Sequence, residues 1–209
     1  DSAFYFAQME YDFAEARNNK KWMANSLNTQ GVSFYLKGNY EKALEYYSKS
    51  LAIKKEIGDK KGMGDSYNNI GLIYRDRGNY EKALEYYSKT LAIDKEIKNK
   101  NGMGSSYQNI GLIYEDQGNY EKALEYYSKS LLILKELGQK KGIASSFSSI
   151  GFLYKEKANY EKALAYFLKS KNIKQEINTI ENLDETSEAL SEVYKKLGKY
   201  KQALEMHEL

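Results

Sequence analysis

The hydrophobic and polar positions of this chain recur with a period of 40 residues. Residues 64–103 and 104–143 match at 28 of 40 positions without a gap. The segment GNYEKALEYYSK occurs three times, a close variant follows, and a weaker copy comes last, at 38–49, 78–89, 118–129, 158–169 and 198–209. This regularity indicates stacked units that bury their faces against their neighbours rather than a closed globule.

Each unit predicts two helices. Large or apolar residues recur at intervals of three and four, which marks one helical face, at Tyr67, Ile70, Gly71, Ile73 and Tyr74. Gly78 supplies the left-handed conformation that ends this helix, and Asn79 can cap the next. The helical period resumes at Tyr80 and continues through Ala83, Leu84, Tyr87, Leu91 and Ile97.

The second helix of the unit carries a favourable charge pair and then ends in a turn. Glu85 and Lys89 form an i,i+4 pair, which contributes about 0.2–0.5 kcal/mol. The polar stretch Lys98–Gly102 predicts the turn to the next unit. We therefore expect an all-α solenoid of antiparallel helix pairs.

Composition removes most enzyme classes. The chain has no cysteine and one histidine, His207, so it offers no disulfide, thiolate zinc site, thiol nucleophile or histidine cluster. It contains no phosphate loop, dinucleotide-binding turn, HExxH or nucleophile elbow. The absence of proline suits uninterrupted helices. We expect a non-catalytic protein without cofactor or metal, and we expect Trp22 and His207 to be structural or exposed.

The recurring residues resemble the signature of the tetratricopeptide repeat (TPR), in which large, Leu-like, Gly, Tyr, Ala and aromatic residues follow in order. One copy of the signature is Tyr67, Ile70, Gly71, Tyr74, Ala83 and Tyr87. The next two copies are Tyr107, Ile110, Gly111, Tyr114, Ala123 and Tyr127, and then Phe147, Ile150, Gly151, Tyr154, Ala163 and Phe167. The resemblance implies a right-handed α-solenoid, the TPR superhelix, with small residues where two helices approach closely.

The repeat length and the missing proline are similar to the long-helix branch of this family, found in kinesin light chains and spindle-orientation adaptors. We interpret 1–209 as a single TPR array, with 1–18 as an orphan second helix of a preceding repeat. Repeats are expected at 20–58, 60–98, 100–138 and 140–178, with a partial repeat at 180–209. These ends favour a chain cut from a longer protein over natural ends, so its localisation stays open.

The resemblance places the first helix of each pair on the concave face. Its inward positions form three columns: Asn28, Asn68, Gln108, Ser148 and Glu188; then Thr29, Asn69, Asn109, Ser149 and Ala189; then Val32, Leu72, Leu112, Phe152 and Glu192. A carboxamide both donates and accepts, so it can pair with the backbone of an extended peptide. The candidate peptide-binding residues are Asn28, Asn68, Asn69, Leu72, Arg75, Gln108, Asn109, Leu112, Glu115 and Phe152. The alternative is that Asn69 and Asn109 only cap or bridge neighbouring helices.

Charge narrows the class of partner. The inner columns carry eight acidic and four basic residues, a net charge of −4, whereas the whole chain is +3. Such a face repels nucleic acid and favours a neutral or basic peptide. The lysines and arginine of the chaperone-type carboxylate clamp are absent from these columns. The stripe Glu185, Glu188 and Glu192 either contributes to binding or only solubilises the end of the array.

The many tyrosines do not indicate a surface that stacks against the bases of a nucleic acid. Of the 21 tyrosines, 18 fall in five recurring positions, which indicates packing. The leading prediction is a protein–protein interaction scaffold that binds a peptide or partner segment. Two alternatives stay open: a sensory or regulatory region of a bacterial signalling protein whose output domain is absent, and end-to-end self-association.

Overall fold

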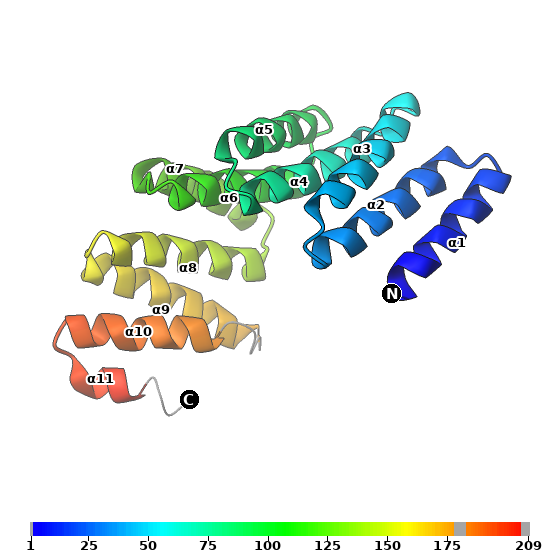
Figure 1. Ribbon diagram of the computed structural model, residues 1–209. Coiled ribbons are helices and arrows are strands. Elements are labelled where there is room, and N and C mark those ends of the chain that lie inside the picture. Colours follow the sequence, from blue (N-terminus) through cyan, green and yellow to red (C-terminus); the bar gives the residue numbers. More distant parts are fainter. Residues whose placement is uncertain (1, 178–182, 206–209) are drawn as a thin grey trace. The chain divides into compact units, whose positions relative to one another are not determined.

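The computed structural model describes residues 2–177 and 183–205, and every secondary-structure element within these ranges is an α-helix (Figure 1). The helices are α1 Ser2–Ala16, α2 Lys20–Leu36, α3 Tyr40–Glu56, α4 Lys60–Asp76, α5 Tyr80–Glu96, α6 Lys100–Asp116, α7 Tyr120–Glu136, α8 Lys140–Glu156, α9 Tyr160–Glu176, α10 Leu183–Lys196 and α11 Tyr200–Glu205. The chain forms two units, Asp1–Gly102 and Met103–Leu209, which are described separately. No described helix is both long and apolar enough to cross a membrane.

The turn within each helix pair follows from two residues. Gly78 has a φ of 71°, the left-handed conformation that glycine adopts without strain. The Asn79 side chain then accepts a hydrogen bond from the backbone N–H of Lys82 at 3.2 Å and so caps α5. Both predictions for this turn are confirmed, and the Glu85–Lys89 pair forms at 2.5 Å.

The turn between pairs is shorter than the predicted Lys98–Gly102. Helix α6 already begins at Lys100. The reason is that Lys98 takes the left-handed conformation, with a φ of 54°, and the Asn99 N–H bonds back to the Asp94 carbonyl at 2.8 Å. The chain has therefore reversed by residue 99, and Gly102 falls in the first turn of the helix.

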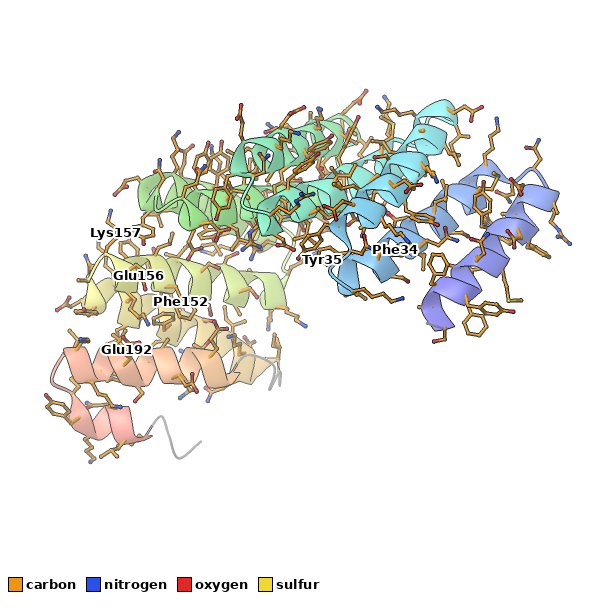
Figure 2. All side chains as sticks on the ribbon, in the orientation of Figure 1. Phe34, Tyr35, Phe152, Glu156, Lys157 and Glu192 are labelled. Atoms are coloured by element: carbon orange, nitrogen blue, oxygen red, sulfur yellow. The ribbon has the colours of Figure 1, made fainter. Side chains whose placement is uncertain are left out.

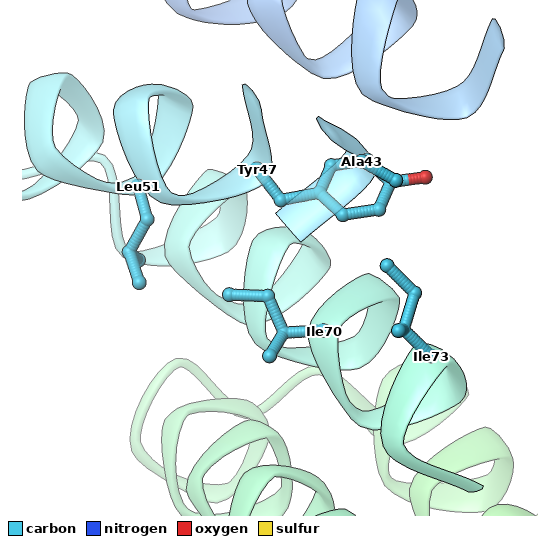
Figure 3. Packing of buried hydrophobic residues seen from close by; sticks show 5 residues of the cluster. All are labelled: Ala43, Tyr47, Leu51, Ile70 and Ile73. Atoms are coloured by element: carbon cyan, nitrogen blue, oxygen red, sulfur yellow. The ribbon is translucent and has the colours of Figure 1, made fainter. Parts of the chain in front are cut away.

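In the first unit, the core lies between the helices of successive pairs. Tyr47 and Ala43 of α3 pack against Ile70 and Ile73 of α4, as Figure 3 shows. Tyr47 also lies close against Gly31 of α2, where an added Cβ would come within 2.6 Å of its ring. Gly71 lies similarly close to Tyr87, at 2.9 Å for an added Cβ, so the close approach expected at the glycine of the signature is confirmed.

The second unit repeats this packing. The buried ring of Phe167 on α9 lies against Gly151 of α8, where an added Cβ would be 2.7 Å from the ring. The same ring joins Leu190 and Val193 of α10 in one hydrophobic cluster. Helix α3 thus contacts both α2 and α4, and α9 contacts both α8 and α10.

Tyrosines outside this core stack on one another. The ring of Tyr86 lies 5.5 Å from that of Tyr74, at an interplanar angle of 11°, and 5.9 Å from that of Tyr67. Lys82 and Lys89 extend over these rings. The prediction that the recurring tyrosines serve packing is confirmed for these columns.

Candidate peptide-binding surface

In the first unit, two predicted carboxamides meet. The Asn69 Nδ2 atom on α4 donates a hydrogen bond to the Asn28 Oδ1 atom on α2 at 3.0 Å. Both side chains are half-buried. The bond links two successive first helices, so the bridging role is present. Because each amide offers two donors and two acceptor lone pairs, this role does not exhaust either group.

The other candidates of the first unit lie on the same stretch of α4. Asn68, Leu72 and Arg75 follow one another at four and three residues, which places them on one helical face. All three are half-buried, and Asn68 and Arg75 make polar or electrostatic contacts within the protein. We call Asn28, Asn68, Asn69, Leu72 and Arg75 the first amide surface.

In the second unit, the corresponding residues of α6 are also half-buried. We call Gln108, Asn109, Leu112, Glu115 and Phe152 the second amide surface. Glu115 accepts a short hydrogen bond from the hydroxyl of Tyr127 on α7. Leu112 packs against the cluster around Tyr127 and Ile150. The carboxylate of Glu115 is therefore directed at the second helix of its own pair.

Phe152 serves the packing of successive pairs. Its ring meets that of Phe167 edge to face, with centroids 4.9 Å apart, and the Lys155 ammonium lies 5.8 Å from its centre. Figure 2 shows Phe152 on α8 near Glu192 on α10. Because the ring is only half-buried, part of it stays accessible beside these contacts.

The carboxamide columns do not continue on α8 and α10. Ser148 and Ser170 hydroxyls hydrogen-bond to each other at 2.8 Å. Ala189, expected on the inner face, is buried and packs in the cluster with Phe167. That expectation is wrong for Ala189, because its methyl group is buried in the cluster against which Phe152 packs.

Several charges of the inner columns are paired within the protein. The Tyr35 hydroxyl on α2 donates to Asp76 Oδ2 on α4 at 2.7 Å. Burial, and then this carboxylate, raise the pKa of Tyr35. Lys155 binds Glu192 at 2.6 Å. The pairing of Glu192 reduces the charge of the acidic stripe, in which Glu185 and Glu188 are exposed.

The described residues contain no group of three or more metal-ligating side chains. His207 lies outside the described residues, and Trp22 is 54% exposed. Trp22 belongs to a hollow between α1 and α2 that sequence reasoning missed. The available signal was the set of positions at which α1 departs from the other second helices.

Comparison with solved structures shows the same fold. BtubC (BKLC) from P. vanneervenii is 20% identical, with a TM-score of 0.86 over 98% of this chain and 87% of that one. A putative kinesin light chain from Podosopora anserina with nearly identical TPR-like repeats is 15% identical, with a TM-score of 0.69 over 88% and 91%.

A Rap protein complexed with competence and sporulation factor is 19% identical, with a TM-score of 0.73 over 91% of this chain and 52% of that one. No curated protein sequence matches significantly. The tetratricopeptide repeat model matches residues 22–96, 62–136 and 102–176. Because these matches together span well over half of its length, the chain belongs to the tetratricopeptide repeat family.

Proposed function

We propose that this protein is a non-catalytic scaffold that binds a peptide or a partner segment through the first helices of its repeats. The observation that carries the proposal is the Asn28–Asn69 pair, half-buried on neighbouring first helices. A bonded carboxamide is held in place, so less conformational entropy is lost when it binds a ligand. Membership of the repeat family, and a bound factor in the similar Rap structure, support this class of function.

Each amide surface binds backbone groups of an extended segment. Asn69 in the first unit and Asn109 in the second offer donors and acceptors that suit any peptide sequence. Leu72 and Leu112 lie three residues further along the same helices and provide apolar contact for ligand side chains. Asn109 also makes a contact within the protein, so ligand binding at this residue adds to or replaces an existing interaction.

The charges beside these surfaces favour a neutral or basic ligand. Asp65 is exposed near the start of α4, and Asp116 is exposed at the end of α6. Although the residue as a whole is exposed, nearby protein atoms partly desolvate the Asp65 carboxyl and raise its pKa, and the nearby Lys54 opposes this rise. A peptide with a net positive charge should therefore bind more tightly than its acidic counterpart, with a difference that falls as salt is added.

The proposal is tested with peptides selected from a random 12-residue display library on the wild-type protein. We expect the double variant Asn69→Ala, Asn109→Ala to bind the selected peptides about tenfold more weakly, because each lost backbone bond contributes about 0.5–1.5 kcal/mol. Asn172→Ala is the matched control, since Asn172 is exposed on the second helix α9. Isothermal titration calorimetry measures binding, and circular dichroism checks folding. Unchanged affinity in the double variant would refute the role of the carboxamides.

A further inference from the structure

A hollow of about 480 Å³ lies between α1 and α2, and none of the residues that line it belongs to either amide surface. Four large apolar side chains line it and are exposed by about half or more: Phe6, Met9, Phe13 and Trp22. The rings of Phe13 and Trp22 stack with centroids 6.3 Å apart, and the Arg17 guanidinium covers Phe13 at 3.4 Å. An exposed group of this kind marks an interaction surface.

The hollow is not a copy of the equivalent place in the other repeats. Met9 stands where the other second helices carry a lysine, at Lys49, Lys89, Lys129 and Lys169. Trp22 stands where the next three first helices carry a glycine, at Gly62, Gly102 and Gly142. Both differences replace a charged or minimal side chain by a large apolar one.

The tryptophan fits because a neighbouring side chain is small. An added Cβ at Gly62 would meet the Asp59 carboxylate at 2.5 Å and the Lys54 side chain at 2.9 Å. The residue that corresponds to Lys54 in α1 is the buried Ala14. The short Ala14 leaves room at the start of α2, so Trp22 is accommodated without displacing α1.

Glu10 changes which kind of helix can pack against the hollow. In the other repeats a serine or threonine occupies its position, at Ser50, Thr90, Ser130 and Ser170, and in three of these four its hydroxyl ties the second helix to its own first helix. The Ser50 hydroxyl donates to the Ala24 carbonyl at 2.7 Å, and Ser170 donates to Ala144 at 2.8 Å. An ionised carboxylate only accepts hydrogen bonds, so Glu10 cannot make this contact. A first helix of the repeat type would place a backbone carbonyl against this carboxylate.

We propose that the hollow binds an amphipathic helix of a partner protein that has a lysine or arginine within its apolar face. Phe6, Met9, Glu10 and Phe13 lie at steps of three and four, so they form one strip of α1 about 10 Å long. Two turns of a partner helix match this length. Among the described residues that line the hollow, Glu10 is the only charged one, so it selects a basic group on the partner.

The proposal is tested with the full chain and two synthetic 18-residue amphipathic helices. The peptides share a leucine face and differ only at its centre, where one has lysine and the other glutamate. Trp22 is the only tryptophan of the chain, so its fluorescence reports on coverage of the hollow. We expect the lysine peptide to shift the emission to the blue and to bind about fivefold more tightly than the glutamate peptide, as an opposite-charge contact predicts.

Two variants assign the effect to this hollow. Glu10→Lys should reverse the preference between the peptides. Met9→Lys, which restores the residue of the other repeats, should lower the affinity for the lysine peptide about tenfold. Lys49→Met is the matched control on α3, and it should bind as wild type does. Both Met9 and Glu10 are exposed, so circular dichroism should show unchanged folding.

Three results would overturn the proposal. One is equal affinity for both peptides in wild type and in Glu10→Lys. Another is the absence of an emission shift at a peptide concentration of about 1 mM. The third is a wild-type dimer in analytical ultracentrifugation that Met9→Lys converts to a monomer, because a second copy of the chain would then occupy the hollow.

Discussion

Replacing Gly111 by alanine tests how closely the two helices of a pair must approach. An added Cβ at Gly111 would lie 2.6 Å and 2.7 Å from two ring carbons of Tyr127. The ring is fully buried, and its hydroxyl donates to Glu115. To reach ordinary contact the ring must move by roughly 1 Å, which disturbs that hydrogen bond.

The magnitude follows from three contributions. Overpacking of a buried ring costs about 1–3 kcal/mol. A weakened bond to a carboxylate adds about 1–2 kcal/mol, while alanine in a helix interior gains about 0.5–1 kcal/mol over glycine. We therefore expect Gly111→Ala to lower the free energy of unfolding by about 2–3 kcal/mol.

Gly104 of the same helix provides the matched control. Its added Cβ would have its nearest neighbour, Leu134, at 3.6 Å, which is ordinary contact. The equivalent positions in α2 and α8 are already alanines, Ala24 and Ala144, and both are buried. Gly104→Ala should therefore raise stability by about 0.5–1 kcal/mol.

Urea unfolding followed by far-UV circular dichroism measures both variants against wild type. The two substitutions should move the unfolding midpoint in opposite directions. If Gly111→Ala proves as stable as Gly104→Ala, the close packing of Tyr127 on α6 does not constrain this position.

Two further predictions concern helix caps and alkaline pH. Asn119→Ala should lower the free energy of unfolding by about 1 kcal/mol, because it removes the cap bond to the Lys122 N–H. Gln139→Asp should raise it by about 0.5–1 kcal/mol, because the Gln139 side chain makes no cap bond to α8. The two substitutions should therefore shift the urea midpoint in opposite directions. Burial raises the pKa of Tyr47 to about 12, so the folded state keeps a proton that the unfolded state loses above about pH 10, and stability falls as the pH rises through this window. Tyr47→Phe should lose about 2 kcal/mol less than wild type between about pH 9 and pH 12, and equal losses in urea titrations would contradict this assignment.

The repeated residues allowed the helix pairs to be predicted in detail. Gly78 and Asn79 act within their own turn, through a left-handed backbone and a cap bond three residues away. Glu85 and Lys89 interact within one helix. These contacts depend on near neighbours in the chain, so the sequence contains the information needed to place them.

The small residues could also be predicted, because a glycine that recurs at the same place in successive repeats indicates a structural requirement that a single copy would not show. Glycine recurs at Gly31, Gly71, Gly111 and Gly151, opposite a large aromatic residue of the second helix. The turn before α6 was not predicted correctly. Its length depends on Lys98 adopting a left-handed conformation, which a lysine takes only when the surrounding contacts require it.

For the candidate surfaces too, some features could be predicted from the sequence and others depend on the tertiary structure. The sequence determined which residues share a helical face, since 3.6-residue periodicity fixes this, and the family resemblance predicted Asn28 and Asn69 as inner-face carboxamides. Only the tertiary structure decided that these two bond to each other, that Glu115 turns to Tyr127, and that Ala189 is buried. The physical reason is that such contacts join helices about 12 to 40 residues apart, where small shifts between helices decide which side-chain atoms come within bonding distance.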